Sequence, residues 1–84
     1  MQDQEIKTTD IYLTAYLLQA KIPAKKIISE GEHRKKVIFV FPGTVQLHEC
    51  IQKFQENQAI VKVRDYTFFL ERVKDLMFAS LRSN

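Results

Sequence analysis

The side chains in this chain best suited to metal or nucleophilic chemistry are two histidines and one cysteine, and their spacing does not assemble a site. His48 and Cys50 lie two residues apart in a segment with helical periodicity, so they project from nearly opposite sides of the helix. His33 is distant in sequence, and a zinc ion needs further ligands. Cys50 falls on the apolar side of its helix, where a free cysteine is typical of a core. We therefore expect no metal site, no nucleophile and no cofactor.

Acid–base and phosphate-binding motifs are equally weak. Glu30 and Glu32 share a predicted turn, and we interpret them as solubilising charges rather than as a catalytic pair. The two glycines, Gly31 and Gly43, are isolated and cannot form a glycine-rich phosphate loop. The sequence therefore predicts a protein that is not an enzyme and has no catalytic residue.

A basic segment is the best remaining candidate for a functional site. The net charge of the chain is +3, yet residues 21–36 carry six Lys or Arg against two glutamates, while residues 1–10 carry a net charge of −2. An anionic partner would be attracted to this segment, although such charges also serve only to keep a hairpin soluble. The candidate phosphate-contacting residues are Lys25, Lys26, Arg34, Lys35 and Lys36.

The segment that must position these charges is an unbroken apolar run over residues 37–41. A strand with one wetted face alternates apolar and polar residues, so this run indicates a strand covered on both faces. We predict an antiparallel hairpin of strands over residues 25–29 and 34–41, joined by a polar turn. Phe39 and Phe41 project to one face, where core packing is favoured over base stacking.

Three helices are predicted around this hairpin. An uncharged helix spans residues 11–20 and ends before Pro23, and amphipathic helices follow over residues 45–57 and 66–81. Residues 59–63 are short, apolar and partly β-branched, which predicts a third strand. The capping residues expected at the three helix starts are Thr8, Thr9, Asp10, Thr44 and Asp65.

Together these elements predict an α+β fold with a small two- or three-stranded antiparallel sheet, in the order α-β-β-α-(β)-α. We assign residues 1–7 to a flexible tail and residues 8–84 to a single compact domain. No apolar run approaches the roughly 18–20 residues of a membrane span, and the polar first ten residues contain no secretory signal. One cysteine cannot form an internal disulfide, as suits a reducing compartment. We therefore expect a cytoplasmic protein that does not bind membranes.

The helix over residues 11–20 also predicts self-association. Apolar side chains surround it almost completely, and so small a domain has little surface with which to cover it. A homodimer would solve this problem, with Tyr12 and Tyr16 at the contact, because each ring combines an apolar body with a hydroxyl.

The run from Thr8 to Leu18, followed by the hairpin that ends at Phe41, resembles a small prokaryotic domain family of unknown function. The hallmark of that family is an opening helix with the pattern D-x-Y-L-x-A-Y-L-L, present here from Asp10 to Leu18. The resemblance covers nearly the whole chain, from Thr8 to Ser80. It implies a stand-alone bacterial or archaeal module and carries over no ligand or catalytic residue.

Two classes of function remain. The first is a non-catalytic nucleic-acid-binding module that uses the basic hairpin on phosphates. The second is a homodimeric protein-interaction or regulatory adaptor that docks a protein partner through the first helix or a sheet edge. The concentrated positive charge favours the first class, whereas the acidic first ten residues and the modest total charge weaken it.

Overall fold

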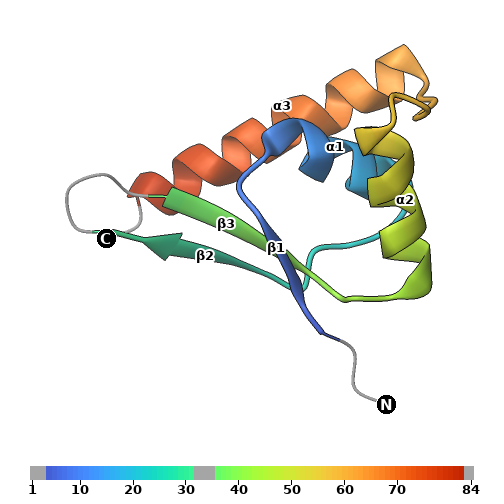
Figure 1. Cartoon of the computed structure of the whole chain (residues 1–84). Helices are drawn as coiled ribbons and strands as arrows, with labels where there is room; N and C mark the ends of the chain where they lie inside the picture. The colour runs from blue at the N-terminus through green and yellow to red at the C-terminus, as the bar shows by residue number, and fades with distance from the viewer. Residues whose placement is uncertain (1–3, 32–35, 83–84) are drawn as a thin grey trace.

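A three-stranded antiparallel sheet carries three helices on one of its faces (Figure 1). The computed structural model describes residues 4–31 and 36–82. The elements follow one another as β1 (Ile6–Thr8), α1 (Ile11–Gln19), β2 (Lys26–Glu30), β3 (Lys36–Phe41), α2 (Val45–Gln55) and α3 (Val63–Arg82). The α+β class, the antiparallel sheet and the three helices are confirmed, whereas the order is β-α-β-β-α-α.

The central strand is β3, which pairs with β1 on one side and with β2 on the other. Val40 lies opposite both Lys7 of β1 and Lys26 of β2. The predicted burial of the apolar run on both faces is confirmed, because Val40 is 0% exposed on one face and Phe39 is 1% exposed on the other.

The core lies between the sheet and the helices. The inner face of β3 supplies Val37, Phe39 and Phe41, and these pack with buried residues of each helix. The fully buried partners include Leu17 of α1, Leu47 of α2 and Val73 of α3, all 0% exposed. The amphipathic stripes of the second and third predicted helices therefore point into one shared core, as the periodicity predicts.

α1 and α2 begin directly after the capping residues that the sequence predicts for them, Asp10 and Thr44. The Asp10 carboxylate accepts hydrogen bonds from the backbone N–H groups of Tyr12 at 2.9 Å and Leu13 at 3.2 Å. The Thr44 hydroxyl accepts one from the N–H of Leu47 at 3.1 Å. These bonds satisfy N–H groups that have no partner within the helix. Asp65, predicted as a cap, lies instead within the first turn of α3.

α1 and α2 end in the same hydrogen-bonded motif. After α1, the N–H of Lys21 donates to Leu18 and the N–H of Ile22 donates to Leu17, both at 3.0 Å. This pair of bonds is a Schellman motif, whose C′ residue adopts a left-handed conformation. Lys21 has φ of 67°, and Asn57 holds the equivalent position after α2 with φ of 58°. Ile22 is buried at 5% exposure, which anchors the chain as it leaves α1.

Two predictions about strands are wrong. Residues 6 and 7, assigned to a flexible tail, belong to β1 and pair with Phe41 and Val40. Residues 59–62, predicted to begin a third strand, have no regular structure, and Val63 already belongs to α3. Both sides of β3 are taken by β1 and β2, and the 59–62 segment pairs with no described strand and contributes Ala59 and Val61 to the core as a loop.

The expectation that one copy leaves α1 uncovered is also wrong. Five consecutive residues of α1, from Leu13 to Leu17, are buried by α2, α3 and the sheet of the same chain. Even Thr14 is 0% exposed, and its hydroxyl donates to the backbone oxygen of Asp10 at 2.8 Å. The packing argument for a homodimer therefore does not hold, and homodimerisation stays a prediction without it.

None of the helices in residues 4–31 and 36–82 combines the length and the apolar composition that crossing a bilayer requires.

Replacing Lys21 by glycine should stabilise the protein. A side chain in the left-handed region costs about 1–2 kcal/mol, and glycine avoids this cost but loses part of the gain to its greater freedom in the unfolded chain. We expect Lys21→Gly to raise the free energy of unfolding by about 0.5–1 kcal/mol, measured by urea denaturation. Lys21→Ala removes the charge but keeps the β-carbon, so it should bring no such gain. An equal gain in both variants would contradict the assignment to backbone conformation.

Candidate functional site

The face of the sheet opposite the helices carries lysines on all three strands. Side chains alternate between faces along a strand, so Lys7 of β1, Lys26 of β2 and Lys36 of β3 share the face of Val40, whereas Phe39 and Phe41 point to the helices. We call Lys7, Lys26 and Lys36 the lysine face. Lys7 and Lys26 flank the same residue of β3, which places their Cα atoms about 10 Å apart.

The burial of Val40 explains why lysines suit this face. Val40 is 0% exposed, yet it does not belong to the hydrophobic cluster shared by the helices. Its cross-strand neighbours on both sides are lysines, and a lysine can lay its four-carbon stem over an apolar surface while its ammonium stays in water. We attribute the burial of Val40 to the stems of Lys7 and Lys26, which leaves two ammonium groups at the edges of an apolar centre.

A shallow pocket of about 230 Å³ lies on the same face. Lys7 and Lys36 both line it, together with Ile38 and the carboxylate-bearing Glu30. The hydroxyl-bearing residues Thr8 and Thr9 complete the lining. Two ammonium groups beside hydroxyl groups are suited to an anionic oxygen ligand such as a phosphate.

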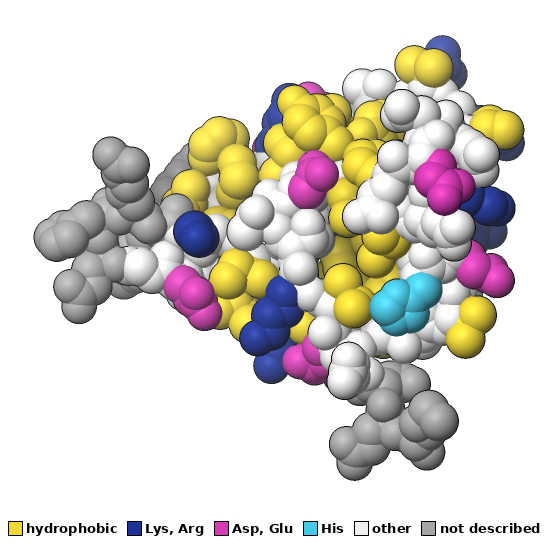
Figure 2. Space-filling view, viewed as in Figure 1, with side chains coloured by type: hydrophobic (Ala, Val, Ile, Leu, Met, Phe, Trp, Pro, Cys, Tyr) yellow, Lys and Arg dark blue, Asp and Glu magenta, His cyan; other side chains and the backbone are white. Residues whose placement is uncertain are grey.

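Carboxylates reduce the positive charge around the lysine face. Glu30 lies opposite Lys36 in the register of β2 and β3. The Lys25 ammonium donates to the Glu5 carboxylate at 3.0 Å, and both side chains are partly exposed. Figure 2 shows basic and acidic side chains interspersed over the strands rather than one continuous basic surface. The lysine face therefore attracts an anion only moderately, and mainly at the positions of the lysines themselves.

The ion pair also changes the acidity of Glu5. The hydrogen bond from Lys25, followed by the charge of Lys25, lowers the pKa of the Glu5 carboxyl below its ordinary value of 4.5. A carboxyl whose pKa is lowered by folding stabilises the folded state above its unfolded pKa, and this contribution is lost as the pH falls through the folded value.

The predicted phosphate contacts have different outcomes. Lys26 and Lys36 lie on the lysine face, whereas Lys25 precedes β2 and pairs with Glu5. Arg34 and Lys35 lie outside the described residues. Lys7 was missed because residues 1–7 were assigned to a tail. The signal for it was the alternation of Ile6, Lys7 and Thr8, which is a strand pattern but is very short.

A glycine holds the strand that carries Lys7. A β-carbon on Gly43 would overlap the backbone carbonyl of Gln4, so the chain before β1 lies directly across the turn between β3 and α2. Only glycine permits so close a backbone approach. Gly43 therefore serves the placement of β1 rather than a phosphate loop.

The two tyrosines predicted at a dimer contact lie in different environments. Tyr12 is 54% exposed, and its backbone oxygen accepts a hydrogen bond from the Tyr66 hydroxyl at 3.2 Å. Tyr16 is only 6% exposed, with its ring 5.7 Å from that of Phe54. Burial, with Cys50 nearby, raises the pKa of Tyr16. Tyr16 is therefore a core residue of the single chain, and of the pair only Tyr12 is available to a partner.

Metal-ligating side chains are dispersed over the part of the chain that the structure describes. Within residues 4–31 and 36–82, no three His, Cys, Asp or Glu side chains are grouped so that they could hold a metal ion. Cys50 is half-buried beside Tyr16, which agrees with the core position predicted for it. His33 lies outside the described residues.

The chain is a small α+β domain with helices on one face of its sheet and lysines on the other. It belongs to the family described as a domain of unknown function, DUF5659, whose model matches residues 3–79. Comparison with curated proteins and with solved structures finds no significant match. The predicted membership of a family of unknown function is confirmed.

The Glu5–Lys25 pair should be visible in an NMR titration of the carboxyl groups. We expect the Glu5 carboxyl to titrate below pH 4.5 in the natural chain, because Lys25 favours its ionised form. Lys25→Gln should move this pKa toward 4.5, whereas Lys53→Gln should leave it unchanged. An unaltered Glu5 titration in Lys25→Gln would show that the ion pair does not persist in solution.

Proposed function

We propose that this domain is a non-catalytic nucleic-acid-binding module that holds backbone phosphates on its lysine face. The observation that supports the proposal is the position of Lys7, Lys26 and Lys36, which lie on three adjacent strands of a face that no helix covers. A paired sheet keeps the backbone positions of these lysines at constant separations, so binding a charged polymer requires ordering only of their side chains.

A polymer fits the lysine face better than a single small anion does. Lys7 and Lys36 line one pocket, while Lys26 lies on the far side of Val40 from Lys7. A phosphate bound in the pocket beside Lys7 and Lys36 leaves Lys26 for a further phosphate, so successive phosphates of one strand can engage all three lysines. Arg34 and Lys35, which directly precede β3 in the sequence, add positive charge to the same hairpin.

The composition of the face predicts how nucleic acid would be read. Phe39 and Phe41 are core residues, so neither can stack on bases. The apolar residues that the register places with the lysines are Ile28, Ile38 and Val40, which offer no hydrogen bonds to base edges. Binding would therefore depend on phosphates, with weak sequence preference and strong salt dependence.

One observation favours a protein partner as the second candidate. β2 forms an edge of the sheet, and no described strand pairs with its outer side. An extended peptide or a second copy of the chain can add a strand to such an edge through backbone hydrogen bonds. In that case the lysines would serve solubility, and oligonucleotides would not bind the face.

A charge-matched pair of triple variants tests the proposal. Lys7, Lys26 and Lys36 are replaced by glutamine in the test variant, and Lys53, Lys62 and Arg64 in the control, so both lose three positive charges. All six side chains are exposed, and the control residues lie on or beside the helices. Binding of a fluorescent single-stranded and a double-stranded oligonucleotide is measured at several salt concentrations.

We expect the test variant to lose most of its affinity and the control to lose little. For B-DNA each lost phosphate contact should reduce the slope of log affinity against log salt concentration by about 0.9, so three contacts reduce it by about 2.7. Amide shifts in the natural chain should centre on residues 7, 26 and 36. Equal losses in both variants would contradict a site on this face, and shifts along β2 with a protein but not with oligonucleotides would favour the second candidate.

A further inference from the structure

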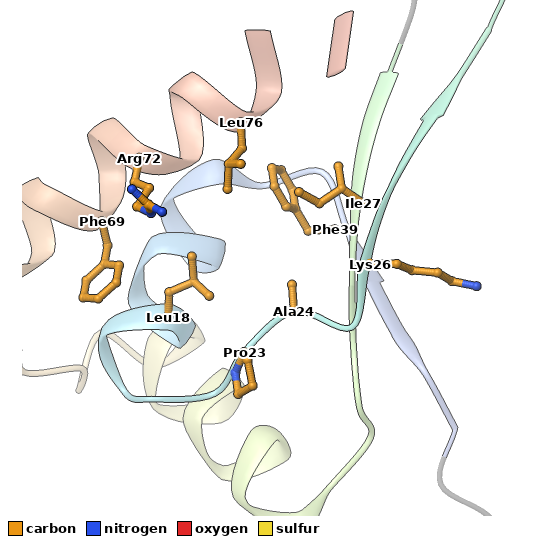
Figure 3. Close-up of a pocket in the computed structure, with 9 residues that line it drawn as sticks. All are labelled: Leu18, Pro23, Ala24, Lys26, Ile27, Phe39, Phe69, Arg72 and Leu76. Atoms are coloured by element: carbon orange, nitrogen blue, oxygen red, sulfur yellow. The ribbon is translucent and has the colours of Figure 1, made fainter. Parts of the chain in front are cut away.

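A second pocket, of about 400 Å³, lies on the helix side of the sheet and is mostly apolar (Figure 3). Its walls come from the end of α1, the loop between α1 and β2, the inner face of the sheet and α3. Its apolar lining includes Leu18, Ala24, Ile27, Phe39, Phe69 and Leu76. This volume falls within the range of small-molecule sites, roughly 300–1,000 Å³.

The pocket arises from a difference in helix length. α1 has 9 residues and α3 has 20, so α3 is about twice as long and continues past α1 along the sheet (Figure 1). Beyond the end of α1, the chain passes to β2 through a loop in which Ala24 offers only a methyl group. Leu76 of α3 is therefore 37% exposed and faces this space.

Arg72 places one positive charge at the rim of this pocket, on the helix side of the sheet. Arg72 follows Phe69 by one turn of α3 and precedes Leu76 by another, so all three line the pocket from the same side of the helix. Lys26 also borders the pocket, but its side chain extends away from it, toward the other face of the sheet (Figure 3). Arg72 is exposed and forms no ion pair with any carboxylate in residues 4–31 and 36–82.

We propose that this pocket binds the alkyl chain of a linear carboxylic acid, with the carboxylate paired to Arg72. The apolar lining suits a hydrocarbon chain, and the planar guanidinium suits the two oxygens of a carboxylate. Among the described lining residues, Arg72 and Lys26 are the only ones with a polar side chain, so a ligand rich in hydroxyl or amide groups would leave those groups unpaired. This site is distinct from the lysine face, which lies on the other side of the sheet.

Titration of the full chain with octanoate, decanoate and decanol tests the proposal, with amide shifts and calorimetry as the readouts. Each buried methylene should strengthen binding about fourfold, so decanoate should bind about fifteenfold more tightly than octanoate. Decanoate should also bind about three- to fivefold more tightly than decanol, which lacks the charge, as expected for an ion pair at an exposed arginine. The shifts should centre on residues 18, 24, 27, 69 and 76.

Variants of two arginines separate the charge from the pocket. Arg72→Gln should reduce the preference for decanoate over decanol to near unity while the binding of decanol persists, which also shows that the variant is folded. Arg64→Gln is the matched control and should keep the full preference. Lys7→Gln combined with Lys36→Gln should leave decanoate binding intact, so loss of the nucleic-acid site and loss of the acid site are distinguishable.

Three outcomes would overturn the proposal. These are an absence of shifts around the pocket, an equal affinity of the natural chain for decanoate and decanol, and pocket shifts that follow protein concentration alone. The last result would assign the apolar surface to contact with a second copy of the chain.

Discussion

The structure depends on the burial of β3 from both sides. A strand with five apolar residues cannot leave either face wet without exposing Val, Ile or Phe to water, and in the described residues three helices are available to cover it. All three helices pack on the face of Phe39 and Phe41. The opposite face is covered differently, by β1 and β2 on either side of Val40 and by the lysine stems that they carry.

This division gives the two faces different chemistry. On the helix side, apolar side chains fill the space wherever α1, α2 and α3 lie together, and a pocket remains where α3 continues without α1. On the other side, the residues best able to cover Val40 without a further layer are long and charged at the tip, so burial of one valine places two ammonium groups in water. The same positions therefore serve packing and anion attraction, which is why a charge-matched control is needed to separate the two roles.

The sequence predicted the elements that depend on residues close together in the chain, through a capping side chain or through helical periodicity over several turns. Asp10 and Thr44 start helices because short polar side chains cap nearby N–H groups, and the stripe from Tyr66 to Leu81 has helical periodicity over several turns. It could not predict β1, because a strand of 3 residues has too little pattern and exists through its pairing with β3. Residues 59–62 show the converse, since a short run with β-branched residues stays a loop where it forms no backbone pairing with the sheet. Lys7 and the rim position of Arg72 depend on these tertiary relations and so were not predicted as site residues.

The apolar ring of α1 shows how a correct local observation led to a wrong packing argument. Counting the apolar residues of α1 against the size of the domain suggested a deficit of cover, but α2, α3 and the sheet of the same chain bury Leu13 to Leu17. In the structure α3 begins at Val63, so its first turns reach α1, and the Tyr66 hydroxyl bonds the backbone of Tyr12. Tyr16 is then enclosed against Phe54 within one chain. Self-association would therefore depend on the open edge of β2, where backbone hydrogen-bonding groups are still available, rather than on uncovered surface of α1.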